Sequence, residues 1–253
     1  MPSSLSTNLY TSWPTGLNWF EEDHFMNGTG AATGRGTVSG TAETSSQSAT
    51  TIAGHPGIWS LVSGTASASL ASLGFPGLQS FSNSSGKYAF RMVFQPLTLF
   101  NAGNTGQIFW GFAPSIIAGT APASGAYFQY DTALSATVPF AVVAGAGSSS
   151  VSSGVTLVAA SWYDSLIVVD NIAATAEFYL AGFQTVPGAF PYYGTPVSSV
   201  NLTSAFASGM QTGAMIIKGV TGVTSVTLNI DFWALAFGAG TLSLTGASIA
   251  SMN

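Results

Sequence analysis

The spacing of acidic side chains decides whether this chain could cleave a glycosidic bond. Glu21 and Asp23 stand two residues apart, a spacing that puts two carboxylates on one face of a β-strand. A glycosidase needs two carboxylates that face one cleft, about 5 to 10 Å apart depending on its mechanism. The next position on that face is Phe25, so no third acid follows. We therefore predict that this pair lies at a solvated edge or turn.

Three further acidic residues belong to expected strands. Asp164 and Asp170 lie near the two ends of one strand, where short acidic side chains favour turns. Glu177 alternates with Phe178, so Glu177 faces solvent or an interface if Phe178 points inward. The nucleophile elbow G-x-S-x-G has no strand-to-helix match. We predict no catalytic residue and no enzymatic activity.

Patterns for metals and cofactors are missing as well. The chain has no cysteine, and His24 and His55 are too few and too scattered for a zinc site. Calcium would take carboxylates and backbone oxygens, and outside the cluster at 21–23 the most plausible donors are Asp131, Asp164 and Asp170, but no D-x-D-x-D-G loop is present. The nucleotide-binding loops G-x-x-x-x-G-K-[ST] and G-x-G-x-x-G are absent too. We predict no metal and no cofactor.

Charged residues are scarce in this sequence. The 253 residues include 4 Lys and Arg and 9 Asp and Glu, or 5% charged, where soluble domains average about 25%. Such a chain cannot intersperse charges over its surface, so we expect much of that surface to be buried against other subunits. A net charge of −5 excludes the basic stripe that nucleic-acid binding needs.

Membrane insertion and export are not expected either. Mean hydropathy is +0.41, yet no apolar run approaches the ~18 residues of a membrane helix. The N-terminal residues lack the basic and apolar regions of a secretory signal, so we expect synthesis in a cytoplasm.

The elements that must position any site are strands. The 30 glycines, with Ser, Thr and Pro, interrupt every stretch, and no window keeps apolar residues at helical spacing. Segments rich in aromatic and β-branched residues predict strands at 58–61, 88–94, 107–112, 126–130, 139–143, 155–158, 162–169, 175–180, 213–218 and 225–237. In the last of these, the alternation breaks at Phe232 and Trp233, which predicts a bulge or full burial. The set predicts an all-β, two-sheet antiparallel sandwich or jelly roll.

Two stretches, 28–54 and 144–154, lack large apolar residues. They predict flexible loops or, alternatively, arms ordered by packing on a neighbour. We expect an N-terminal arm over 1–19, one jelly-roll domain over 20–237 and a C-terminal arm over 238–253 that docks on a neighbour.

Aromatic side chains are abundant, with 6 Trp, 8 Tyr and 17 Phe. Most are expected in the core of the sandwich, as Trp59, Trp110, Trp162 and Trp233 illustrate. Four others lie in segments rich in Pro and Gly, and they are candidates for interface contacts or for stacking on glycans: Trp13, Trp19, Tyr192 and Tyr193.

Several motifs follow one another in a particular order. An acidic-aromatic segment at 20–25 precedes His55-Pro56-Gly57, and aromatic strands follow at 88–94, 108–112 and 127–131. A strand led by Trp162, the segment at 176–182 and Asp231-Phe232-Trp233-Ala234-Leu235 complete the series. In this order the chain resembles the concanavalin A-like (laminin G-like) jelly-roll modules of virion structural proteins from tailed bacteriophages. The sequence departs from the family in its near lack of Arg and Lys and over residues 181–210.

The resemblance implies a virion structural protein, made in the host cytoplasm, that decorates or cements a phage capsid. Its expected partners are further copies of itself, with a trimer as the expected symmetry, and other virion proteins such as the major capsid protein. A tail-fibre or spike module that binds host glycans is the alternative. A glycan-cleaving enzyme is the third possibility, but the E-x-D-x-E strand of glycosidases with this fold is missing.

Overall fold

The computed structural model describes residues 19–23, 37–41, 44–47, 57–74, 86–114, 122–145, 149–182, 195–202, 211–219 and 221–238. Within these residues the chain forms strands and connections and no helix. The strands are β1 (Trp19–Asp23), β2 (Thr37–Thr41), β3 (Thr44–Gln47), β4 (Trp59–Val62), β5 (Leu70–Gly74), β6 (Lys87–Pro96), β7 (Gly106–Ala113), β8 (Gly125–Asp131), β9 (Phe140–Ala144), β10 (Ser149–Ser152), β11 (Tyr163–Asp170), β12 (Thr175–Gly182), β13 (Ser198–Asn201), β14 (Gln211–Lys218) and β15 (Thr227–Gly238).

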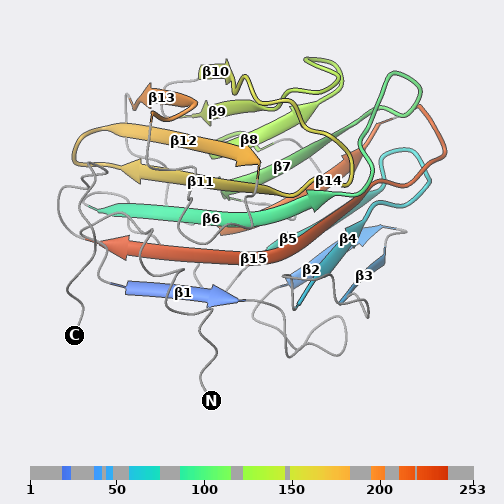
Figure 1. The fold of residues 1–253 in the computed structure, drawn as a ribbon, viewed down its shortest axis with the longest axis horizontal. Helices are drawn as coiled ribbons and strands as arrows, with labels where there is room; N and C mark the ends of the chain where they lie inside the picture. The colour runs from blue at the N-terminus through green and yellow to red at the C-terminus, as the bar shows by residue number, and fades with distance from the viewer. Residues whose placement is uncertain are drawn as a thin grey trace.

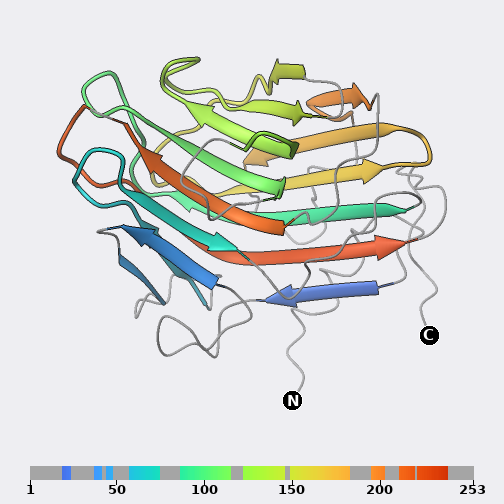
Figure 2. The same cartoon turned by 180° about the vertical axis from the view of Figure 1, so that it is seen from behind.

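The strands form two antiparallel sheets, as the sequence predicted. Sheet A has the order β13-β12-β11-β6-β15-β4-β3, and β1 also pairs with β15. Sheet B has the order β10-β9-β8-β7-β14-β5-β2. The two sheets face each other in two layers (Figures 1 and 2). The expected jelly-roll sandwich is therefore confirmed.

The core lies between the sheets because alternate residues of the central strands are apolar and point inward. In β6 the residues at even positions from Tyr88 to Phe94 belong to the core cluster, and in β7 Ile108, Trp110 and Phe112 do the same. Their rings interlock, with the Trp110 centroid 4.9 Å from Phe94 and 5.2 Å from Phe128. Such aromatic contacts add to the free energy of burial.

Strand β15 runs through the middle of sheet A and contains the expected irregularity. Its register with β6 shifts between Ile230 and Phe232, which marks a β-bulge. The bulge changes which residues face inward: Leu228 and Ile230 before it belong to the core, and Trp233 and Leu235 do so after it. The predicted break in alternation is confirmed.

Glycines face one another across neighbouring strands of sheet B. Gly213 in β14 is opposite Gly111 in β7 and Gly74 in β5. Gly213 has φ +156°, and a Cβ built on it would lie 2.1 Å from the Leu73 carbonyl oxygen. Any side chain at this position would collide with the backbone of β5, so only glycine allows the strands to approach.

Some expected boundaries were wrong. No strand covers 155–158. Loops or arms were expected over 28–54 and 144–154, but these stretches contain the strands β2, β3 and β10. Their serines, threonines and glycines form strands because neighbouring strands supply hydrogen-bond partners. The strands β5 and β13 were also not predicted.

Candidate functional site

The three cations that the structure describes are buried. Lys87, Arg91 and Lys218 are 1%, 2% and 1% exposed. A buried cation is stable only with a partner, because leaving water costs several kcal/mol. The fourth cation, Arg35, lies outside the described residues.

Arg91 is held by Asp164 on the outer face of sheet A. Its Nε donates to Asp164 Oδ1 at 3.1 Å, and its Nη2 donates to Oδ2 at 2.6 Å. The two residues come from β6 and β11 and sit diagonally across the strand pair, since Arg91 is opposite Leu166 and Asp164 is opposite Val93. The guanidinium carbon also lies 5.5 Å from the centre of the Phe232 ring. The expected turn at Asp164 was wrong, because this carboxylate lies inside a strand and binds a cation.

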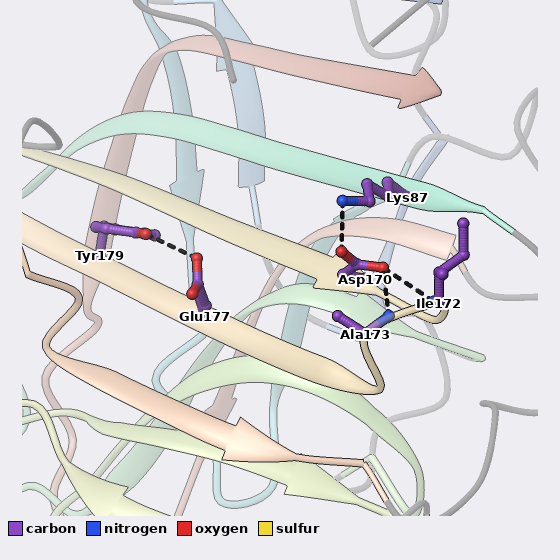
Figure 3. Close-up of polar contacts among 6 residues, drawn as sticks. All are labelled: Lys87, Asp170, Ile172, Ala173, Glu177 and Tyr179. Atoms are coloured by element: carbon purple, nitrogen blue, oxygen red, sulfur yellow. Dashed lines mark hydrogen bonds and ion pairs between the residues drawn. The ribbon is translucent and has the colours of Figure 1, made fainter. Parts of the chain in front are cut away.

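Lys87 pairs with Asp170 at the other end of the same strands. Lys87 Nζ lies 2.5 Å from Asp170 Oδ2. The other oxygen, Oδ1, accepts the backbone N–H groups of Ile172 and Ala173 at 2.9 Å each, which closes the turn between β11 and β12 (Figure 3). The prediction that Asp170 forms a turn is confirmed.

Glu177 lies on the outer face of β12, and its neighbour Phe178 is fully buried in the core. Its Oε2 accepts the hydroxyl of Tyr179 at 2.8 Å (Figure 3). Burial raises the pKa of Tyr179 strongly, and the hydrogen bond to Glu177 and its negative charge raise the pKa further. The expectation for Glu177 is confirmed in part, because the side chain is half-buried and bonded within the chain.

Asp131 ends β8 and was a candidate calcium ligand. Its Oδ2 accepts the amides of Gln107 at 2.6 Å and Gln129 at 3.0 Å, and its Oδ1 accepts the N–H of Ala133 at 2.8 Å. Both oxygens therefore have partners within the chain. In the part of the chain that the structure describes, no three His, Cys, Asp or Glu side chains gather where they could hold a metal ion.

These contacts remove charge from the surface. Where the structure describes the side chains, no charged residue is exposed: seven of them are buried and Glu177 is half-buried. The carboxylates of Asp131, Asp164, Asp170 and Glu177 bind cations, amides or hydroxyls of the same chain. The part of the surface that these described side chains form is therefore neutral.

Several connections between strands meet at one end of the sandwich. The loops after β4, β6 and β14 lie together at the right-hand end of Figure 1. Hydrogen bonds join them: Ser63 N–H donates to the Val226 carbonyl at 2.9 Å, and the hydroxyls of Thr105 and Thr221 are 2.7 Å apart. Lys218 Nζ donates to the Gly222 carbonyl at 2.6 Å. Exposed aliphatic side chains project from the connections at this end: Leu97, Leu134, Val158 and Val223.

The aromatic residues go mainly to the core. Trp59, Trp110 and Trp233 are buried as expected, and Trp162 is half-buried against Phe232 and its neighbours. Among the side chains that the structure describes, no aromatic residue is exposed. This part of the surface therefore has no aromatic platform for a sugar ring.

Most of the residues that were expected to contact a neighbour or a glycan lie outside the described residues. Trp19 begins β1, where its backbone is paired with Phe237 of β15. Trp13, Tyr192 and Tyr193 lie outside the described residues, as do His24 and His55. Glu21 and Asp23 belong to β1, opposite Leu235 and Trp233.

Sequence reasoning missed the buried ion pairs, because Arg91 and Asp164 are separated by 73 positions. The alternation of Arg91 with core residues in β6 was the one available signal.

No helix in the described part of the chain is long and apolar enough to cross a membrane.

Comparison with known proteins places the chain in a family and a fold. The family model described as SO2946-like, C-terminal domain, matches residues 54–235. No curated protein matches the chain. A crystal structure of the protein of unknown function SO2946 from Shewanella oneidensis MR-1 is similar, with a TM-score of 0.59 and 14% identity over 98% of each chain.

Plant lectins have the same fold. Lectin II from Ulex europaeus gives a TM-score of 0.55 at 10% identity, covering 88% of this chain and 99% of the lectin. The basic winged bean lectin, solved with Tn-antigen, gives 0.54 at 12% identity, covering 88% of this chain and 100% of the lectin. At these identities the likeness concerns the lectin-like jelly-roll fold.

Proposed function

This chain belongs to the SO2946-like, C-terminal domain family, and from the neutral surface of its described part we propose that it is a non-enzymatic structural protein that holds an assembly together. The assembly we propose is a phage virion, with this protein decorating or cementing the capsid. Its partners would be further copies of the chain, in a trimer, and other virion proteins such as the major capsid protein. The order of motifs between Phe20 and Phe237 supports the phage assignment.

The observation that carries the proposal is the placement of charge. A free soluble domain keeps charged side chains on its surface, where they cost little and prevent association. Here the described charges lie inside the domain, and the described part of the surface offers hydroxyl groups, small residues and a few aliphatic side chains. Such a surface can be buried against a neighbour, and no unpaired charge would then be left in the interface.

We propose that this protein neither catalyses a reaction nor binds nucleic acid. Support for the absence of catalysis comes from Asp164, Asp170 and Asp131, whose carboxylates are engaged by Arg91, Lys87 and Gln107. Lys87, Arg91 and Lys218 are buried and therefore give phosphate groups no exposed contact. We propose that the protein needs no cofactor and acts by contact alone.

Self-association at different salt concentrations tests this function. The purified chain should form oligomers in sedimentation equilibrium and native mass spectrometry, and these should persist from low salt to about 1 M NaCl, where surface ion pairs are screened. Localisation of the chain on purified particles by cryo-electron microscopy should then show density repeated over the capsid. A chain that stays monomeric at every accessible concentration and is missing from particles would contradict the proposal.

Glycan binding is the second candidate, and the fold supports it, because the similar winged bean lectin was solved with Tn-antigen. The candidate stacking residues are Trp13, Trp19, Tyr192 and Tyr193. A glycan array should show binding by the wild-type chain and loss of binding in Tyr192→Ala/Tyr193→Ala. If the variant retained every signal on the array, these two tyrosines would not be the glycan-binding residues. Density at the tail tip in cryo-electron microscopy of purified particles would favour glycan binding as the function.

A further inference from the structure

Strand β10, which lies close to β13 of sheet A, is an edge strand of sheet B. It pairs with β9 on one side, with Val151 opposite Ala141, and it is the last strand in the order of that sheet. Ser150, Val151 and Ser152 are exposed. Proteins usually block such an edge with lysine, proline or a bulge, because its free backbone groups can pair with another chain. None of these devices occurs in the strand Ser149–Ser152.

The hydrogen-bond pattern shows which backbone groups point away from the sheet. Ser153 N–H donates to the Pro139 carbonyl at 3.0 Å, so Ser153 is in a hydrogen-bonded pair with β9. Pairs of this kind alternate along antiparallel strands, so Val151 and Ser149 also direct their N–H and C=O groups at β9. Ser150 and Ser152 then direct theirs outward. Within the described part of the chain, no hydrogen bond engages these outward groups.

The sequence of this edge reads the same in both directions. Residues 149 to 153 are Ser-Ser-Val-Ser-Ser, with Val151 at the centre. A twofold interface brings the same surface of two copies together, so it needs a self-complementary pattern. Antiparallel pairing about Val151 would set each serine of one copy against a serine of the other.

From this geometry we infer that β10 pairs with β10 of a second copy, in antiparallel orientation about Val151, and joins two B sheets into one continuous sheet. Ser150 of one copy and Ser152 of the other form a hydrogen-bonded pair, and the twofold axis repeats it. Val151 meets the same residue of the second copy at the axis. The neutral surface around the edge permits the approach, since no described charge is exposed there to repel its counterpart.

This inference rests on the proposed assembly function and assigns one of its contacts. A strand contributed by a different virion protein could use the same backbone groups, but only a second copy would place Val151 opposite another Val151. The twofold pairing is compatible with a larger assembly in which other surfaces provide further contacts.

Cysteine cross-linking tests the pairing directly, because the chain contains no cysteine. In Val151→Cys the two thiols would face each other in a non-hydrogen-bonded pair, where Cα atoms are about 4.5 Å apart and a disulfide can form. Ile172→Cys is the matched control, since Ile172 is 57% exposed and Val151 is 42% exposed, but Ile172 lies in the turn after β11. Under mild oxidation of the dilute full-length chain, Val151→Cys should form at least about tenfold more disulfide dimer than the control.

A backbone variant provides the second readout. Ser150→Pro removes an outward N–H group and leaves the pairing with β9 in place, whereas Ser150→Ala keeps the N–H group. Both variants should keep the circular dichroism spectrum and melting behaviour of the wild-type chain. Ser150→Pro should weaken self-association by about tenfold or more, and Ser150→Ala should not.

The outcomes separate this inference from the proposed function. If the wild-type chain forms oligomers but Val151→Cys cross-links no better than Ile172→Cys and Ser150→Pro changes nothing, the β10 pairing is wrong and the assembly function stands. If the wild-type chain is monomeric and Val151→Cys shows no preference, both are wrong. Preferential linking with loss of association in Ser150→Pro supports the pairing.

Discussion

Trp110 and Ser165 link the two sheets through a buried hydrogen bond. The indole Nε1 of Trp110 in sheet B donates to the hydroxyl of Ser165 in sheet A at 3.1 Å, and Ser165 donates to the Met92 carbonyl at 3.1 Å. Both side chains are almost fully buried. The indole N–H of Trp110 in sheet B is therefore satisfied by a side chain of the facing sheet.

Ser165→Ala should destabilise the domain because it leaves the Trp110 N–H without its acceptor. The expected loss in the free energy of unfolding is about 1 to 3 kcal/mol, the cost of an unsatisfied buried donor. Urea unfolding measures it, with Ser150→Ala on the exposed edge as a control that should change stability very little. An equal effect of both substitutions would contradict the role of the hydrogen bond.

Removal of one partner from the Arg91 and Asp164 pair should be more damaging than removal of both. Arg91→Met leaves a buried carboxylate unpaired and should cost about 3 to 5 kcal/mol. The double variant Arg91→Met/Asp164→Leu should recover most of that loss, because apolar residues of similar size can fill a buried site. A double-mutant cycle by chemical unfolding gives the coupling energy, and strictly additive losses would show that the two groups do not depend on each other.

Stability should fall at high pH because of buried tyrosines. Burial raises the pKa of Tyr127 and Tyr130 to about 12, above the value of 10.0 for the free side chain. The unfolded chain releases these protons first, so their contribution is fully present below pH 10 and is lost as pH rises from about 10 to 12. Unfolding titrations followed by tyrosinate absorbance measure this window.

Tyr130→Phe separates one contribution from the rest. The Tyr130 hydroxyl contacts the carbonyl oxygens of Phe100 at 2.7 Å and Ala136 at 2.8 Å, so the variant should be less stable at neutral pH. It should also lose less stability than the wild-type chain between pH 10 and 12. An unchanged alkaline loss would mean that Tyr130 ionises equally in both states.

Gly213→Ala should disrupt sheet B. The added Cβ would lie 2.1 Å from the Leu73 carbonyl oxygen, and the backbone at φ +156° disfavours any side chain. We expect a loss of about 2 kcal/mol or more in unfolding free energy. Gly182→Ala is the matched control, because a Cβ there meets nothing within 4 Å, and its stability should stay close to that of the wild-type chain.

Strands with large apolar residues could be predicted from the sequence, and strands of small polar residues could not. The expected strands at 107–112, 126–130 and 175–180 lie within β7, β8 and β12. Burial of their aromatic and β-branched residues in the core offsets the conformational entropy that is lost when these strands form. The serine-rich β10 has no such signal, because its conformation depends on hydrogen bonds from β9.

The candidate site shows the same division. The sequence alone determined that this protein is an all-β sandwich with very few charges, because alternation and composition are local properties that any fold of the chain must respect. The tertiary structure decided where the charges are: Arg91 meets Asp164 and Lys87 meets Asp170 through the register of β6 with β11. Strand register depends on pairings between segments that are distant in the sequence, so no local sequence pattern predicts the register. The burial of these charges is therefore seen only in the folded domain.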